Sequence, residues 1–233
     1  MRTNQHGLFV EFAGVPAAGK TTVANAILDR IQDRGVEPNL PTERINSLPI
    51  YTRVPTKLMY ASLATISQGP DLHQMERKIV NSEQKQHRDT VALLVNFAFL
   101  AGVIQQYRKN SITILDQGIH QAVWSVGFRS FQSWNEVYDD WLPVPQSLRS
   151  DLLVVIRSDV DTLEQRLAQR RTRPSRLTGR GDEVEHAING IELMVERLSS
   201  GKEHPRVIEV NNERQSSLDE ISDGILQEIP ASP

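Results

Sequence analysis

The chain has 233 residues, a formal net charge of −3 and no cysteine. This length suffices for one large α/β domain, and we expect a single domain over residues 1–233. The balanced charge argues against a nucleic-acid or membrane partner, and the lack of cysteine excludes disulfides and thiolate metal sites. Because polar residues 1–7 lead directly into an apolar run, we expect no signal peptide and a cytoplasmic location.

The first predicted strand, residues 8–13, is followed by a sequence that matches the phosphate-loop pattern G-x-x-x-x-G-K-[ST] at every fixed position. Residues 22–31 then read as a helix. A strand–loop–helix turn points backbone N–H groups and a helix dipole at phosphate oxygens. Lys20 is expected to reach the β- and γ-phosphates, and the Thr21 hydroxyl to ligate Mg²⁺. The residues expected to bind a nucleoside triphosphate are Gly14, Pro16, Ala17, Ala18, Gly19, Lys20, Thr21 and Thr22.

A second strand is predicted at about 37–42, although Pro38 and Pro41 interrupt it. Glu43 and Arg44 follow, at a position that faces the γ-phosphate end of such a site. Glu43 could act as general base on an acceptor hydroxyl while Arg44 orients the acceptor. The alternative is a surface ion pair in a proline-rich loop.

The connection to the third strand is much longer than one helix requires, and we interpret residues 44–109 as a helical insertion on the acceptor side. Gly69-Pro70 marks a turn before two long helical stretches. Inserted helices at the carboxyl edge of a sheet commonly shape a pocket. The apolar stretch 91–104, interrupted by Asn96, is shorter than a membrane span and typical of a buried core helix.

Asp116 directly follows the third predicted strand, residues 111–115. Beside a phosphate loop, a carboxylate at this position can hold Mg²⁺ or accept a proton from the acceptor. The alternative is an aspartate that starts a turn or caps the next helix. Gln117 and Gly118 follow in place of the glutamate that motor ATPases use to activate water, which disfavours that class.

Aromatic residues gather in a short segment after this strand: Trp124, Phe128, Phe131, Trp134, Tyr138 and Trp141. Their three- and four-residue spacing favours one helical face, although we expect Gly127 to break the helix. Core packing is one interpretation, and an aromatic wall for a planar acceptor is the other. The histidines show no ligand-like spacing, and no metal site beyond Mg²⁺ is expected.

An arginine-rich segment follows the fourth predicted strand, residues 152–156. Between residues 166 and 180 the chain has six arginines and no acidic residue. Clustered like charges repel one another, so a bound anion would stabilise them. We interpret residues 166–182 as a phosphate lid in which Arg170 and Arg173 neutralise charge during transfer. A solvated basic face and a local nucleic-acid patch are the alternatives.

A fifth strand is predicted at 206–210, and helical segments separate all five strands. This alternation favours an α/β fold with a parallel sheet between two layers of helices, a three-layer sandwich. The buried character of 152–156, a continuous apolar run, agrees with such a sheet.

With these parts in place, the chain resembles the P-loop nucleoside and nucleotide kinases, most nearly the thymidylate kinase group. The matching parts, about half of the chain, are the phosphate loop, residues 112–125, residues 151–176 and the ending from residue 207 to 229. The resemblance implies a five-stranded sheet of order 2-3-1-4-5, ATP with Mg²⁺ as donor, and Arg166 near the adenine. Gln117 departs from the Asp-Arg pair of that group, and residues 91–99 lack its expected arginine. Both arginines would hold an acceptor phosphate.

The leading functional hypothesis is an ATP-dependent kinase of small molecules, with a nucleoside- or nucleotide-like acceptor. A phosphotransferase acting on an antibiotic or another hydroxylated metabolite is an alternative. A regulatory nucleotide-binding switch is an alternative of another class. A homodimer is an assembly that the sequence allows.

Overall fold

The computed structural model describes residues 7–67, 69–108, 112–142, 144–169, 177, 181–201, 205–211, 223 and 227. Within them, four parallel strands form one sheet in the order β2-β1-β3-β4. The strands are β1 (Leu8–Ala13), β2 (Ile112–Leu115), β3 (Leu152–Arg157) and β4 (Arg206–Asn211). The predicted α/β class with a parallel sheet is therefore confirmed.

The prediction of a strand at 37–42, and with it the five-stranded order 2-3-1-4-5, is wrong for the described residues. This segment contributes an isolated bridge instead, in which Asn39 pairs with Thr113 of β2. The Asn39 N–H donates to the Ile112 carbonyl at 2.9 Å, and its carbonyl accepts from the Ile114 N–H at 2.8 Å. Pro38 has no N–H to extend this ladder, and Pro41 already begins the next helix.

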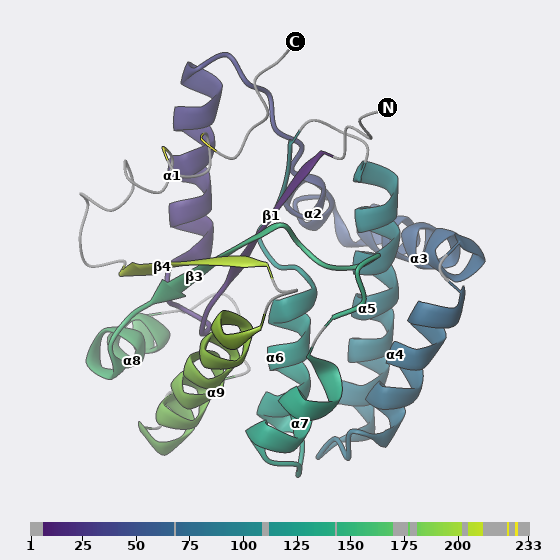
Figure 1. Cartoon of the computed structure of the whole chain (residues 1–233), viewed down its shortest axis with the longest axis vertical. Coiled ribbons are helices and arrows are strands. Elements are labelled where there is room, and N and C mark those ends of the chain that lie inside the picture. Colours follow the sequence, from purple (N-terminus) through teal and green to yellow (C-terminus); the bar gives the residue numbers. More distant parts are fainter. Residues whose placement is uncertain are drawn as a thin grey trace.

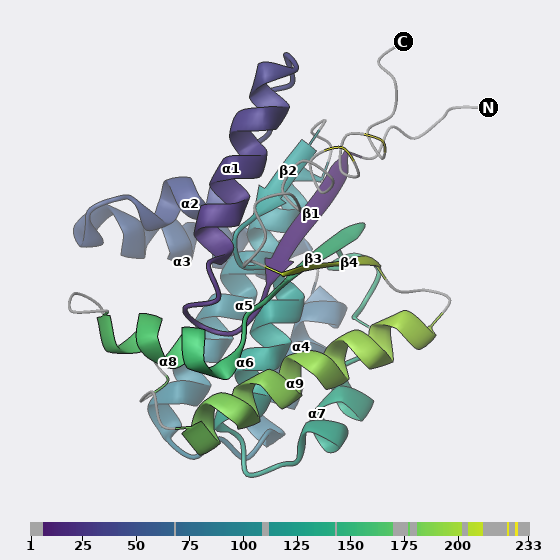
Figure 2. The ribbon, with the colours of Figure 1, turned by 90° about the vertical axis from the view of Figure 1, so that its left-hand side faces the viewer.

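Helices lie on both sides of the sheet. They are α1 (Lys20–Asp33), α2 (Pro41–Asn46), α3 (Ile50–Ser67), α4 (Gly69–Asn81), α5 (His87–Tyr107), α6 (Ile119–Arg129), α7 (Trp134–Trp141), α8 (Val160–Gln169) and α9 (Gly181–Ser200) (Figure 1). Figure 2 shows the sheet between α1 on one side and α5, α6 and α9 on the other. The helix predicted near the end of the chain, within residues 207–229, lies outside the described residues.

The central strands β1 and β3 carry most of the core of the sheet, since almost every residue in both is buried. The edge strand β2 is buried as well, because the Asn39 segment and α2 cover its outer side. The opposite edge strand, β4, is more exposed. Burial on this pattern fixes the carboxyl ends of β1, β2 and β3 at one edge of the sheet.

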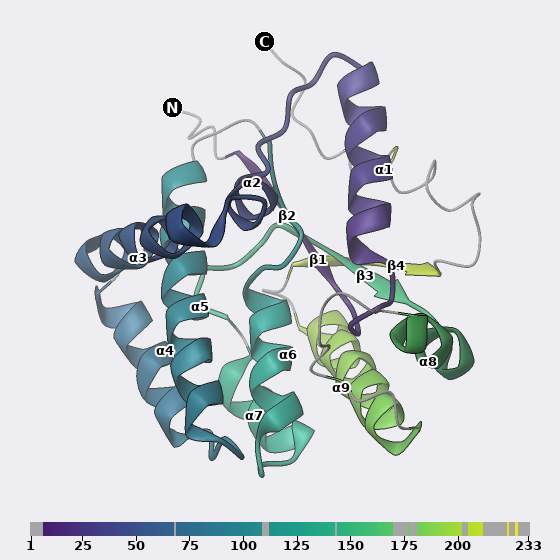
Figure 3. The same cartoon turned by 180° about the vertical axis from the view of Figure 1, so that it is seen from behind.

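The insertion between residues 44 and 109 folds into helices as predicted, and α5 is its buried member. Its 21 residues are long and apolar enough to cross a membrane by length and composition, which the shorter estimate of residues 91–104 missed. Half of that stretch is buried inside the molecule, however, as in a core helix. Figure 3 shows α3 crossing α5, with α1 on the other side of β1 and β2.

The aromatic segment forms two helices, and the expectation that Gly127 breaks the first of them is wrong. Helix α6 continues through Gly127 to Arg129. A Cβ at this position would lie 2.2 Å from the Trp134 ring, and one at Gly190 of α9 would lie 2.4 Å from the same ring. These glycines therefore admit the indole between α6 and α9.

Candidate active site

The phosphate loop leaves β1 in a conformation that requires glycine at two positions. Gly14 has φ +153°, and a Cβ there would lie 2.6 Å from the Ile156 carbonyl oxygen of β3. Gly19 has φ +96° and precedes α1 as its N-cap, with no side-chain cap. The first N–H groups of α1 are therefore not occupied by a capping side chain, which suits an anion.

Arg166 of α8 lies against the middle of this loop. Its Nη1 donates to the carbonyls of Ala17 and Ala18, at 3.5 and 3.4 Å. Ala17 has φ +76°, a left-handed conformation that costs an alanine about 1–2 kcal/mol. Such a conformation persists where its surroundings hold it, and Arg166 is one of the groups that do so. The position of Arg166 near a bound adenine stays a prediction.

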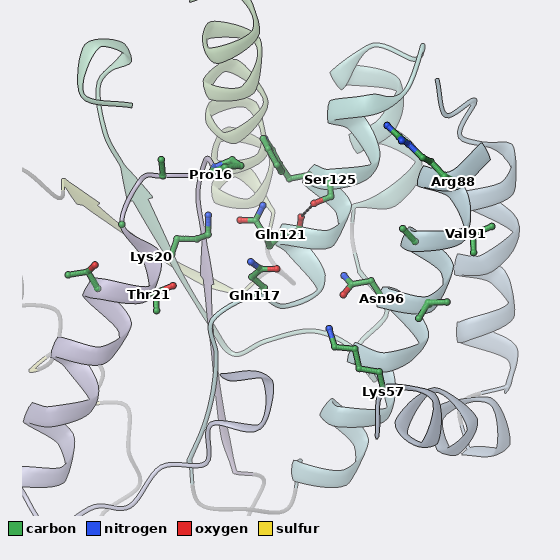
Figure 4. Close-up of a pocket in the computed structure, with 16 residues that line it drawn as sticks. Pro16, Lys20, Thr21, Lys57, Arg88, Val91, Asn96, Gln117, Gln121 and Ser125 are labelled. Atoms are coloured by element: carbon green, nitrogen blue, oxygen red, sulfur yellow. Dashed lines mark hydrogen bonds between the residues drawn. The ribbon is translucent and has the colours of Figure 1, made fainter. Parts of the chain in front are cut away.

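The Lys20 side chain folds back across the loop. Its Nζ donates to the Gly14 carbonyl at 2.6 Å and to the Val15 carbonyl at 3.1 Å. This places a cation over the concave side of the loop, where Lys20 and Thr21 also line a cavity (Figure 4). A lysine at this point is positioned to meet the β- and γ-phosphates, as the motif predicted.

Asp116 follows β2 at the same edge of the sheet, because β2 runs parallel to β1 in a register that pairs Leu115 with Glu11. The N-cap of α6 is Gly118, so Asp116 does not cap that helix. Its Oδ1 is buried and has no hydrogen-bond partner among the described residues. A buried carboxylate oxygen without a donor is costly unless a ligand or cation meets it.

Thr21 and Asp116 fit the predicted magnesium site in chemical type, since Mg²⁺ takes oxygen ligands and completes its shell with water and phosphate. Within the part of the chain that the structure describes, no group of three or more His, Cys, Asp or Glu side chains could hold a metal. A site with one hydroxyl and one carboxylate therefore depends on nucleotide phosphates for its remaining ligands.

A buried polar group beneath the loop was missed by the sequence analysis. Glu11 of β1 is 1% exposed, and its carboxylate accepts from the Gln121 N–H at 2.9 Å and contacts His120 Nδ1 at 2.8 Å. Gln121 Oε1 in turn accepts from the Gly14 N–H at 2.9 Å. The available signal was a glutamate inside an apolar strand, which needs buried partners.

The same group fixes the turn after β2. A Cβ on Gly118 would lie 2.4 Å from Glu11 Cδ, so only glycine fits between the carboxylate and the start of α6. Glu11 thus sets the path of residues 116–118 and, through Gln121, contacts the phosphate loop. We regard Glu11 and Gln121 as positioning residues of the candidate site.

A cavity of ≈ 750 Å³ extends from the phosphate loop to α3, α5 and α6. Figure 4 shows Lys20 and Gln121 facing the space between the loop and α5. The lining residues beyond the loop are Lys57, Arg88, Val91, Ala92, Val95, Asn96, Gln117, Gln121, Trp124 and Ser125. Helices of the insertion therefore form the wall opposite the loop, as predicted.

The acceptor-side residues predicted from sequence are only partly gathered here. Glu43 and Arg44 belong to α2, and neither lines the cavity. Arg88 does line it, together with Lys57, which the sequence analysis did not single out. Burial lowers the pKa of Lys57, as does the charge of Arg53, whereas Asp116 opposes this shift.

The aromatic residues serve mainly as core. Trp124 stacks on Phe128 and Trp134, with ring centroids 5.1 and 6.2 Å apart, and its Nε1 donates to the Ala187 carbonyl of α9. Phe131 is exposed. Only Trp124 of this set also lines the cavity among the described residues, so both interpretations apply at that position.

The predicted lid is described only at its ends. Arg166 lies on the phosphate loop as given above, whereas Arg170 and Arg173 lie outside the described residues. Their role stays a prediction.

Comparisons with known proteins add the fold. No family model and no curated protein matches the sequence. Structures of deoxyadenosine kinase from M. mycoides share the fold, with dATP bound (12% identity, 95% of this chain, 100% of that chain, TM-score 0.54). The form with products dCMP and a flexible dCDP gives 12% identity, 94% and 100% coverage and a TM-score of 0.55. The dCTP-bound form gives 14%, 95%, 100% and 0.53.

At this identity, the likeness establishes the fold of P-loop kinases for almost the whole chain. These neighbours are nucleoside kinases, so the resemblance to the thymidylate kinase group in particular is not confirmed.

Proposed function

We propose that this protein is an ATP-dependent kinase that transfers the γ-phosphoryl group to a nucleoside- or nucleotide-like acceptor. The observation that carries the proposal is the phosphate loop opening directly onto the ≈ 750 Å³ cavity. Such a cavity exceeds what a triphosphate end alone requires and provides room for a second substrate. The nucleoside kinases that share the fold support the same class of reaction.

In the proposed reaction, an acceptor oxygen bonds to the γ-phosphorus as the bond to the β,γ-bridging oxygen breaks, and ADP leaves. Lys20 and the N–H groups of the loop bind and orient the phosphates. Thr21 and Asp116 would hold Mg²⁺, which neutralises phosphate charge when bound. A hydroxyl acceptor must also lose its proton, and Asp116 or Glu43 is the base that we propose. Arg170 and Arg173 are proposed to neutralise developing charge.

The cavity also separates this proposal from a regulatory nucleotide switch. A switch acts through nucleotide-responsive loops and a partner surface, and it needs no second-substrate cavity beside its phosphate site. A kinase needs that cavity. The same feature is compatible with a non-nucleotide hydroxyl acceptor, which the experiment below includes.

The test is a screen for ADP formation by the purified full chain with MgATP. The acceptor panel contains nucleosides, nucleoside monophosphates, hydroxylated metabolites and aminoglycoside antibiotics, each compared with a reaction without acceptor. We expect at least one nucleoside or nucleotide to raise ADP formation far above that background. A rate that no acceptor changes would contradict the kinase assignment, and a response to non-nucleotide hydroxyls alone would redirect it.

A further inference from the structure

The acceptor wall of the cavity is electropositive. Lys57 of α3 and Arg88 of α5 both line it, in addition to Lys20 on the loop side. Among the described residues that line the cavity, none is aspartate or glutamate. A neutral acceptor gives two such cations no counter-charge, whereas an anionic acceptor does.

Lys57 lies at the inner end of this wall. Its Nζ is 4.7 Å from the centroid of the Phe99 ring, and its side chain is half-buried. Figure 4 shows the ammonium pointing toward the space between Asn96 and Gln117. The described residues offer it no hydrogen-bond acceptor, and its nearest charges are Arg53, which repels it, and Asp116. A partly desolvated ammonium in this state favours an anionic ligand.

Arg88 marks the opposite end. It lies 11 residues before Phe99 on α5, which corresponds to about 16 Å along the helix at about 1.5 Å per residue. Between the two cations the wall consists of Val91, Ala92, Val95 and the amide of Asn96. The inner cation is therefore the one beside Asp116 and the phosphate loop, and the outer cation lies at the exposed rim.

We propose that Lys57 binds a phosphate monoester on the acceptor, so that the acceptor enters the cavity already phosphorylated. This inference rests on the proposed function. Lysine binds phosphate as a compact point charge, and a phosphate near its second ionisation carries up to two negative charges. The apolar and amide surface beyond Lys57 then contacts the rest of the acceptor. Gln117, a neutral residue on the facing turn, can add a hydrogen bond but no charge.

The experiment measures binding by titration calorimetry with the full chain, in matched pairs. Nucleosides are compared with their 5′-monophosphates, and ribose with ribose 5-phosphate, which separates a nucleotide from a sugar phosphate. The variants are Lys57→Met, which removes the charge, and Lys57→Arg, which keeps it. Lys85→Met is the matched control, because Lys85 also lies over a phenylalanine ring, Phe131, but does not line the cavity.

We expect at least one phosphorylated member to bind at least about 10-fold more tightly than its parent, as one charge-assisted contact provides. Lys57→Met should remove that preference, Lys57→Arg should keep most of it, and Lys85→Met should not change it. Melting temperatures of the variants identify any loss of folding, and in that case Lys57→Gln replaces Lys57→Met.

Parent compounds that bind as tightly as their phosphates, binding by neither, or a preference that survives both neutral substitutions would overturn the assignment. Phosphoryl transfer to neutral acceptors alone would leave the kinase function standing and refute this inference. Lys57-dependent phosphate binding without phosphoryl transfer to any acceptor would do the reverse.

Discussion

At the scale of single residues, the phosphate loop was predictable and its support was not. The residues of the loop form a contiguous pattern with fixed spacing, so one sequence suffices to find it. Glu11 and Gln121 are 110 residues apart and have no such pattern. Their roles follow from a parallel sheet that brings the end of β1 beside the start of α6, which only the folded chain shows.

Asp116 provides the first prediction at this scale. Asp116→Asn should slow phosphoryl transfer by about 10²-fold or more, because the amide cannot replace a metal-orienting or basic carboxylate. The melting temperature should change little, since Asp116 Oδ1 has no hydrogen bond within the described residues to lose. Steady-state rates and thermal melts check both parts, with Asp33→Asn at the exposed end of α1 as control. An unchanged rate in folded Asp116→Asn would assign Asp116 to the turn alone.

Glu11 provides the second prediction. Glu11→Ala should lower the free energy of unfolding by about 3 kcal/mol or more, since it leaves the Gln121 N–H and His120 buried without their acceptor at about 1–3 kcal/mol each. Urea denaturation measures this change. The exposed Glu37→Ala should stay within about 0.5 kcal/mol of the parent. Equal effects of the two substitutions would show that Glu11 is not a supporting group.

At the scale of elements, apolar runs located the four observed strands, and the long insertion was correctly expected to be helical. The second strand failed because a run of suitable residues cannot form a ladder where prolines remove N–H donors. Gly127 failed for a different reason. Local propensity treats glycine as a helix breaker, whereas here the packing of Trp134 against two helices decides the residue.

The third prediction uses this contrast. Gly127→Ala should lower the free energy of unfolding by at least about 1 kcal/mol, because overpacking of about 1–3 kcal/mol exceeds the helical gain of alanine. The Trp134 ring has no room to withdraw, since Gly190 lies against its other side. Chemical denaturation measures the change, with Ser199→Ala at the exposed end of α9 as control. Stabilisation by Gly127→Ala would mean that propensity, not packing, governs this position.

At the scale of the whole molecule, the sheet fixes the phosphate loop, Asp116 and Arg166 at one edge, and the insertion builds the facing wall. The fold class followed from the alternation of elements in the sequence. The contents of the wall did not, because Lys57 and Arg88 come from different helices whose packing no local pattern specifies. The sequence therefore predicted a kinase-like site, while the charge of its acceptor side emerged from the structure.

The most direct test of this account follows the γ-phosphoryl group itself. The full chain is incubated with γ-labelled MgATP and the acceptor that the screen identifies, and label in the purified acceptor is measured for the parent and for Lys20→Ala. We predict label transfer by the parent and nearly none by Lys20→Ala at an unchanged melting temperature, because Lys20 is positioned for the β- and γ-phosphates. Equal transfer by both proteins, or label released only as inorganic phosphate, would contradict the account.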